Sequence, residues 1–363
     1  MKDKEYIEEL FRKLSEIDGG SDVIITNGKP PQFRVNNDLV SADNEVLTSE
    51  DTAGICQSLL RADQLERFQT EKEFDFSYFI EDVARFRVNL YFQRGSAAMA
   101  ARIIPEDIPS MEELNLPPII KYFAEKRQGL ILITGPVGSG KSTTIASMVD
   151  HINNTRPCHI VSIEDPIEYT HKHKLSTIDQ REVGTDTHSF AEALKRVLRQ
   201  SMDVVVVGEI RDQKSAQAAM TLAETGHLTL ATLHTKGTVD SANRLIDIFP
   251  SDKNYQIRVQ LAASLAGVIW QQLLPRCDEE GLILACEIMT TTSAVSALIR
   301  KGRTQEIYSL IQSGREHGMC TMEDAIKELV DTGKVDESMQ YQDIGQLSTH
   351  INKMEYEMIE SGK

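Results

Sequence analysis

The strongest constraint in this sequence is a glycine-rich turn that lies between an apolar run and a helical pattern. Residues 135–142 read Gly-Pro-Val-Gly-Ser-Gly-Lys-Ser and fit the phosphate-loop pattern G-x-x-x-x-G-K-[ST] at every fixed position. The apolar residues 130–133 precede the turn, and Ile145, Met148, Val149 and Ile152 follow it at helical spacing. Backbone amides of such a loop, together with the helix N-terminus, bind phosphate oxygens. The sequence therefore predicts a nucleoside triphosphate site on a strand–loop–helix unit.

The loop residues have distinct expected roles. Lys141 is expected to reach the β- and γ-phosphates, and the Ser142 hydroxyl to coordinate Mg²⁺, so ATP and Mg²⁺ are the expected ligands. The expected nucleotide-binding residues are Gly135, Pro136, Val137, Gly138, Ser139, Gly140, Lys141, Ser142 and Thr143. An ordinary strand-to-helix turn is the alternative, and the complete motif in its proper context argues against it.

Three later apolar runs are each followed by a polar side chain, namely Glu164, Glu209 and His234. In an open parallel sheet, ligands gather at the carboxyl ends of the strands, so these side chains are expected to surround the terminal phosphate. One of the two carboxylates, Glu164 or Glu209, would activate the attacking water, and the other would help to hold Mg²⁺ through water. A helix cap or a solvated strand end is the alternative for either carboxylate alone. On spacing alone, His227 and His234 are read as structural residues.

Composition narrows the class of protein. The chain has 363 residues, enough for two or three domains, and its 55 acidic and 39 basic residues give a net charge of −16, which disfavours bulk nucleic-acid binding. No apolar run approaches the roughly 20 residues of a membrane-spanning helix. The five cysteines are scattered, which argues against a disulfide framework and a zinc site. A cytoplasmic location is expected.

The hydrophobic pattern changes along the chain. An amphipathic helix opens it, and strict alternation over residues 85–92 predicts an antiparallel strand, so residues 1–100 read as a small α+β domain. Prolines mark residues 101–118 as a linker. Residues 119–363 read as an α/β domain with buried parallel strands, helical from Thr290 to the end.

With these segments in hand, the chain resembles the secretion-superfamily ATPases, and closely their type IV pilus retraction branch, the PilT/PilU family. The matching blocks are residues 135–142 (Walker A), 162–169 (Asp box), 180–184, 203–212 (atypical Walker B) and 225–234 (His box). The resemblance implies that Glu164 is the catalytic base and that Glu209 takes the acidic Walker B role. It also implies that His227 and His234 line the nucleotide site.

The same resemblance implies a PAS-like N-terminal domain and a RecA-like ATPase domain with a C-terminal helical subregion. It implies a homohexamer at the cytoplasmic face of the inner membrane, bound to the pilus platform protein and peripheral to the membrane only through partners. The acidic net charge argues against action on nucleic acid. Family arginines of the N-terminal domain reach the nucleotide, and Arg85, Arg87, Arg94 and Arg102 match that region. A solvated polar strand face is the alternative for these four.

Two departures from the family bear on function. The chain lacks the four-cysteine zinc site of type II secretion ATPases. The family motif A-I-R-N-L-I-R-E appears as Ala-Val-Ser-Ala-Leu-Ile-Arg-Lys over residues 294–301, which leans toward the accessory, PilU-type members. The expected function is ATP hydrolysis that powers pilus retraction in twitching motility. The alternatives are a pilus assembly or type II secretion ATPase, a nucleotide-dependent coupling subunit for a paralogous retraction ATPase, and a translocase whose ATPase activity responds to DNA.

Overall fold

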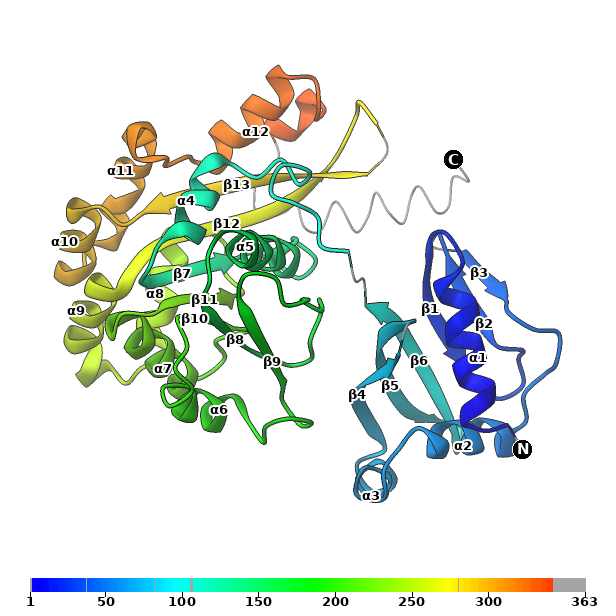
Figure 1. The fold of residues 1–363 in the computed structure, drawn as a ribbon. Helices are drawn as coiled ribbons and strands as arrows, with labels where there is room; N and C mark the ends of the chain where they lie inside the picture. Colours follow the sequence, from blue (N-terminus) through cyan, green and yellow to red (C-terminus); the bar gives the residue numbers. More distant parts are fainter. Residues whose placement is uncertain (1, 37, 82, 105–106, 280, 342–363) are drawn as a thin grey trace. The chain divides into compact units, whose positions relative to one another are not determined.

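The structure is a computed structural model that describes residues 2–36, 38–81, 83–104, 107–279 and 281–341. The chain divides into two compact units: residues 1–107 with 166–170, and residues 108–165 with 171 onward (Figure 1). Within the described ranges, every helix is too short or too polar to cross a bilayer.

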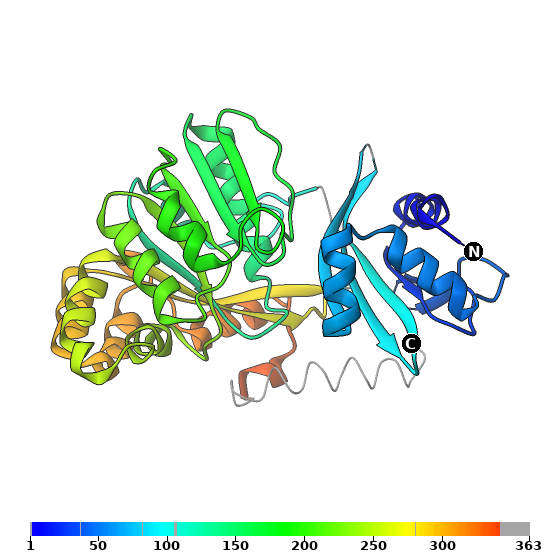
Figure 2. The ribbon, with the colours of Figure 1, turned by 90° about the horizontal axis from the view of Figure 1, so that it is seen from below.

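The first unit is built on a six-stranded antiparallel sheet of order β3-β2-β1-β6-β5-β4. Its elements are α1 (Lys4–Ser15), β1 (Gly20–Ile25), β2 (Gln32–Val35), β3 (Asp38–Ser41), α2 (Ser49–Ser58), α3 (Ala62–Glu71), β4 (Glu73–Ile80), β5 (Ala84–Gln93) and β6 (Ser96–Ile104). Figures 1 and 2 show α1 and α2 on one side of this sheet. The expected α+β unit with an antiparallel sheet is confirmed.

Amphipathic patterns explain the core of this unit. Asp3 caps α1 through the amide of Tyr6, and the apolar stripe of the helix is buried. Phe11 on that stripe stacks on Phe86 of β5, with ring centroids 4.2 Å apart. Inward-facing residues of β5 are fully buried up to Leu90, whereas Phe92 is 38% exposed. One alternating strand thus holds the helix on one face and leaves the arginine face outside.

The boundary after the first unit differs from the expected one. β6 continues to Ile104, four residues into the segment 101–118 that was expected to be a linker, because those residues pair with β1 and β5. Pro105 lies outside the described residues. Pro118 opens the helix α4 (Pro118–Glu125), since proline fits the first helical turn. The exact limits of the two domains stay a prediction.

The second unit is built on a seven-stranded mixed sheet of order β13-β12-β7-β11-β10-β8-β9. Its strands are β7 (Gly129–Thr134), β8 (His159–Glu164), β9 (Thr177–Glu182), β10 (Val204–Val207), β11 (Leu228–Leu233), β12 (Leu265–Pro275) and β13 (Leu282–Thr290). Its longer helices after α4 are α5 (Lys141–Thr155), α6 (Phe190–Val197), α7 (Gln213–Glu224), α8 (Thr238–Asp247), α9 (Asn254–Ser264), α10 (Ser293–Lys301), α11 (Ile307–Ser313) and α12 (Met322–Asp331). The expected RecA-like α/β unit is confirmed.

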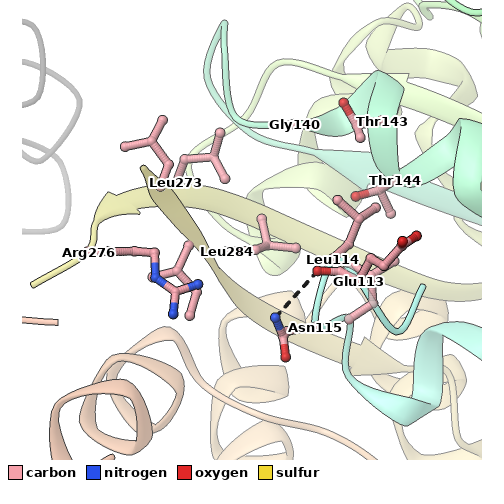
Figure 3. A pocket seen from close by; sticks show the side chains of 12 residues that line it. Glu113, Leu114, Asn115, Gly140, Thr143, Thr144, Leu273, Arg276 and Leu284 are labelled. Atoms are coloured by element: carbon pink, nitrogen blue, oxygen red, sulfur yellow. Dashed lines mark hydrogen bonds between the residues drawn. The ribbon is translucent and has the colours of Figure 1, made fainter. Parts of the chain in front are cut away.

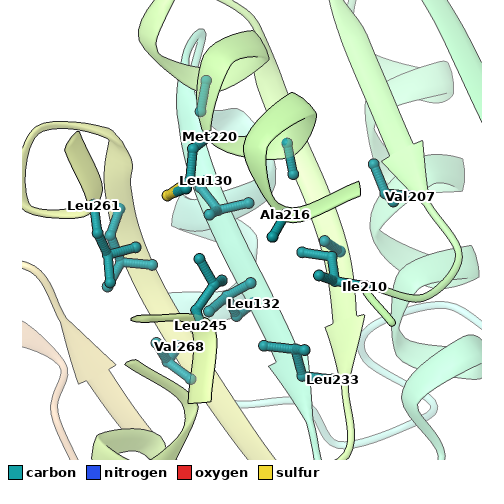
Figure 4. Packing of buried hydrophobic residues seen from close by; sticks show 14 of the residues in the cluster. Leu130, Leu132, Val207, Ile210, Ala216, Met220, Leu233, Leu245, Leu261 and Val268 are labelled. Atoms are coloured by element: carbon teal, nitrogen blue, oxygen red, sulfur yellow. The ribbon is translucent and has the colours of Figure 1, made fainter. Parts of the chain in front are cut away.

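Helices cover both faces of the central strands. Leu130 and Leu132 of β7 point to the face that is covered by α6, α7, α8 and α9 (Figure 4). Ile131 and Ile133 point to the opposite face, covered by α4 and α5. Because successive strand residues face opposite sides, a strand buried on both must be apolar throughout. This explains why the apolar runs in the sequence do not alternate.

The hairpin formed by β12 and β13 was not expected from the sequence. β12 runs parallel to β7, and β13 runs antiparallel to β12 as an edge strand of the sheet. Buried glutamines such as Gln271 and Gln272 interrupt the apolar pattern of β12, which conceals the strand. The expected helical character after Thr290 is confirmed as far as Tyr341, and the final residues, 342–363, lie outside the described ones.

Gly267 provides a test of this packing. A Cβ atom there would lie 2.4 Å from the ring of Phe123, a fully buried residue of α4. We expect Gly267→Ala to destabilise the second unit by about 1–3 kcal/mol, since overpacking forces the ring to move. The midpoint of thermal unfolding measures the effect. Adding Phe123→Leu should restore part of the loss, whereas a wild-type midpoint for Gly267→Ala alone would contradict the packing.

Candidate functional site

The phosphate loop joins the central strand β7 to α5. Gly140 is the N-cap of α5 and has a φ of 81°, which glycine adopts without strain. Gly135 has a φ of 146°, and a Cβ atom there would lie 2.4 Å from the carbonyl oxygen of Gln271. Val137 at the tip is 89% exposed. The loop therefore curls tightly over the end of the sheet, with its apolar tip toward solvent.

Two polar side chains lie inside the curl. Lys141 is 8% exposed, and its Nζ donates to the carbonyl oxygens of Gly135 (3.1 Å) and Pro136 (2.6 Å). Ser139 is 2% exposed, and its Oγ has no hydrogen-bond partner within the described part of the chain. A buried hydroxyl without a partner costs free energy unless a ligand satisfies it. The loop thus presents a cation and an unsatisfied polar group to the same small space.

Strand register brings three of the predicted residues to the edge where this loop begins. β11 pairs in parallel with β7 up to Thr134, β10 with β11, and β8 with β10. Glu164 ends β8, Glu209 follows β10 by two residues, and His234 directly follows β11. Parallel strands end on the same side, so these side chains and the loop share one edge.

His234 and Glu209 belong to one chain of contacts. His234 Nδ1 lies 3.2 Å from the carbonyl oxygen of Gly135, and His234 Nε2 lies 3.7 Å from Glu209 Oε1. Arg211 Nε donates to Glu209 Oε2 at 2.6 Å, and Arg211 Nη1 lies 3.7 Å from Asp165 Oδ2. The phosphate loop is thereby connected through one histidine to the acids of two neighbouring strands.

Glu164 is held by two side chains that the sequence analysis did not single out. Ser162 Oγ donates to Glu164 Oε1 at 2.6 Å, and Gln180 Nε2 donates to the same oxygen at 3.2 Å. Gln180 also accepts from the backbone amide of His171 at 2.8 Å. Burial lowers the pKa of His171 to about 4, which keeps it uncharged beside this network near neutral pH. The shared block 180–184 was the available signal for Gln180.

Within its own unit, His227 does not lie at this edge, and the expectation that it lines a nucleotide site stays a prediction. It precedes β11, so it lies about 20 Å along the strand from His234. Its Nδ1 lies 3.1 Å from the carbonyl oxygen of Leu222 at the end of α7. The two histidines of one sequence block are separated because the strand between them is fully extended and buried. Within the unit, His227 has a structural position.

The four arginines of the first unit fall into separate places. Arg87 and Arg102 are cross-strand neighbours on β5 and β6, and Arg102 Nε donates to Asp22 at 2.8 Å. Arg85 lies two residues before Arg87, opposite Ile104. Arg94 occupies the turn after β5 with a φ of 48°, about 30 Å along the strand from Arg85. Three of the four therefore cluster, and a contact of any of them with nucleotide stays a prediction.

A cavity of about 230 Å³ opens beside the start of α5 (Figure 3). Gly140, Thr143 and Thr144 form one wall, residues 113–116 a second, and residues of the β12–β13 hairpin a third. Leucine side chains dominate the lining, and Asn115 and Arg276 add polar groups. Arg276 is held by Asp278 in a two-pronged contact of 2.9 and 2.7 Å. The cavity shares residues with the phosphate loop and was not predicted from the sequence.

Comparisons with known proteins agree with this arrangement. The family described as "Type II/IV secretion system protein" matches residues 109–363. The type IV pilus retraction ATPase PilT of Pseudomonas aeruginosa is 40% identical over 317 residues, covering 87% of this chain and 92% of that one. The type IV pilus ATPase PilU of the same organism is 38% identical over 328 residues, covering 90% and 86%.

The fold agrees as well. The crystal structure of the pilus retraction motor PilT with bound ADP superimposes with a TM-score of 0.85 at 40% identity, covering 96% of this chain and 99% of that one. Similarity of this extent in sequence and fold identifies a family. The chain belongs to the type IV pilus retraction ATPases of the PilT/PilU family.

Proposed function

We propose that this chain binds Mg-ATP at the phosphate loop and hydrolyses it to power type IV pilus retraction. The observation that carries the proposal is the convergence of the loop, Glu164, Glu209 and His234 at one edge of the sheet. Lys141, already inside the loop, neutralises charge on the β- and γ-phosphates. The buried Ser139 hydroxyl gains a partner in a phosphate oxygen.

The site also offers oxygen ligands of the kind that Mg²⁺ prefers. Ser142 stands in the first turn of α5, and the Glu209 side chain is 23% exposed at the neighbouring strand ends. A hydroxyl and a carboxylate fit a small hard cation that keeps several water ligands. We assign Ser142 to direct coordination and Glu209 to coordination through water. The ion, when bound, offsets the negative charge of the triphosphate.

Glu164 is the proposed general base. Donors from Ser162 and Gln180 fix its Oε1 and hold the carboxylate in one orientation. It accepts a proton from a water molecule whose oxygen bonds to the γ-phosphorus. The bond from phosphorus to the bridging oxygen breaks, and ADP and inorganic phosphate result. His234 contacts both the loop and Glu209, and this position lets it respond to the presence of the terminal phosphate.

The cavity beside α5 is the proposed site of the nucleoside. A nucleotide whose phosphates rest on the loop amides extends past Thr143, which also lines the cavity. The leucine lining suits the faces of a purine ring, and Asn115 and the walls at residues 113–116 provide polar groups for its edge. The cavity thus accounts for the part of ATP that the phosphate loop does not contact.

We further propose that the chain works as a homohexamer at the cytoplasmic face of the inner membrane, on the pilus platform protein. This proposal rests on family membership, since relatives carry the names of pilus retraction ATPases. Hydrolysis would change the conformation of each subunit in turn and move the bound partner. Arg85, Arg87 and Arg102 are the proposed source of a guanidinium that contacts the nucleotide.

One observation favours an accessory role as the second candidate. In α10, Leu298 and Ile299 match the family motif and pack into the unit, whereas Lys301 is exposed and replaces the motif's glutamate. A reversed charge on an exposed position changes what a partner would contact. The chain would then couple to a paralogous retraction ATPase, with its own ATP binding intact.

Two substitutions test the chemistry. We expect Lys141→Ala to abolish ATP binding, because a buried cation that contacts the phosphates is lost. Glu164→Gln should retain binding while turnover falls about 100-fold or more, because only the proton acceptor is removed. Calorimetry and phosphate release measure the two effects. Glu192→Gln, at an exposed carboxylate of α6, is the control. Normal turnover by Glu164→Gln would refute its role as base.

Deletion of the gene tests the biological role. Cells without the protein should keep their pili and lose twitching, because assembly continues while retraction stops. The wild-type gene should restore twitching, and the Lys141→Ala gene should not. Loss of pili would instead indicate an assembly ATPase. Turnover by the purified protein that requires an added paralogue would indicate the accessory role.

A further inference from the structure

A short segment connects the phosphate loop to the β12–β13 hairpin. It comprises residues 234–238, from His234 after β11 to Thr238 at the start of α8. At one end, His234 contacts the carbonyl oxygen of Gly135 at 3.2 Å. In the middle, Thr235 Oγ1 lies 2.7 Å from Ser241 Oγ, which lies 3.1 Å from Thr134 Oγ1 at the end of β7. The segment is therefore tied to the strand that carries the phosphate loop.

The other side of the segment is held by a cross-strand pair. Trp270 and Glu287 are directly opposite each other on β12 and β13. Trp270 Nε1 donates to the carbonyl oxygen of Thr235 at 3.0 Å. Glu287 Oε1 accepts from the backbone amide of Thr238 at 2.8 Å and from its hydroxyl at 2.7 Å. This cross-strand pair therefore holds the segment just after His234 by hydrogen bonds to Thr235 and Thr238.

Glu287 is an unusual group for this position. It is 6% exposed, and Thr238 is fully buried. Burial raises the pKa of the Glu287 carboxyl, while hydrogen bonds from Thr238 and from the backbone amide of Met322 oppose that rise. Thr238 and Met322 are the first residues of α8 and α12, so one carboxylate holds two helix N-termini. A buried acid is costly unless such donors surround it.

We propose that Glu287 is a positioning residue for His234, acting through segment 234–238, and that Trp270 reports the state of that segment. The proposal rests on the proposed function, since it requires ATP at the phosphate loop. Only three residues separate His234 from Thr238. A shift of His234 toward a terminal phosphate must therefore move the carbonyl that Trp270 contacts or strain the bonds to Glu287. Fixing Thr238 limits the positions that His234 can take.

Kinetics of full-length variants test the positioning role. Glu287→Met removes the acceptor for Thr238 and should lower kcat about tenfold with little change in ADP affinity, because His234 acts at the terminal phosphate. Glu287→Gln keeps an acceptor oxygen and should recover most of the loss. Thr238→Val should lower kcat while Thr238→Ser should not, and this milder pair decides the matter if Glu287→Met fails to fold. Glu328→Gln, at an exposed carboxylate of α12, is the control.

A double variant separates positioning from mere structural support. If Glu287 acts through His234, then His234→Ala combined with Glu287→Met should turn over no more slowly than His234→Ala alone. Losses in kcat that simply multiply would overturn the proposal. So would unchanged kcat in both Glu287→Met and Thr238→Val.

Fluorescence gives an independent readout, because Trp270 is the single tryptophan of the chain and is 4% exposed. Its emission should change when a non-hydrolysable ATP analogue binds to the wild type, and should not change in His234→Ala. Displacement of a fluorescent nucleotide measures binding separately. Binding without any change in wild-type emission would overturn this inference alone. Absence of nucleotide binding would overturn the proposed function and this inference together.

Discussion

The parallel pairing of β7, β11, β10 and β8 is the constraint on which the candidate site depends. Each strand contributes only one or two chemical groups, and none of them would form a site alone. Pairing in register places the carboxyl ends side by side, so the phosphate loop, His234, Glu209 and Glu164 meet at one edge. Burial on both faces fixes that register, since a slip of one residue would exchange the residues facing the two helical layers.

Backbone geometry at the loop sets a second constraint. A Cβ atom at Gly135 would collide with the carbonyl oxygen of Gln271 on β12, so the hairpin and the phosphate loop are packed as closely as glycine allows. The same hairpin forms a wall of the cavity and grips the segment that carries His234. β12 and β13 therefore contact the site at the loop, the cavity and the segment. The hairpin supports the site as well as extending the sheet.

The network around the site combines exposed and buried contacts of different strength. The ion pair between Arg211 and Asp165 involves side chains that are 60% and 42% exposed, so solvent screens it and it contributes little to stability. The bonds to Glu287 are buried and hold two helix N-termini. The exposed contacts are free to rearrange when ligand binds, whereas the buried ones resist rearrangement. Such a division suits a site that must change with the nucleotide while its framework stays fixed.

The sequence by itself determined the phosphate loop, the two carboxylates and the order of the two units, because each depends on local pattern. A strand followed by a glycine-rich turn and a helix is readable within about 25 residues, and an apolar run marks a strand buried on both faces. The sequence could not separate His227 from His234. The two histidines are only seven positions apart in the sequence, but the extended strand between them separates them by about 20 Å.

Tertiary structure alone decided the contacts between distant segments. The β12–β13 hairpin was concealed by buried glutamines, and its place beside β7 depends on pairing with a strand more than 100 residues away. The bonds from Ser162 and Gln180 to Glu164, the cavity beside α5 and the grip of Glu287 on Thr238 arise from that packing. Local sequence preferences do not predict such long-range contacts, because these contacts stabilise the protein only once the distant segments have come together in the sheet.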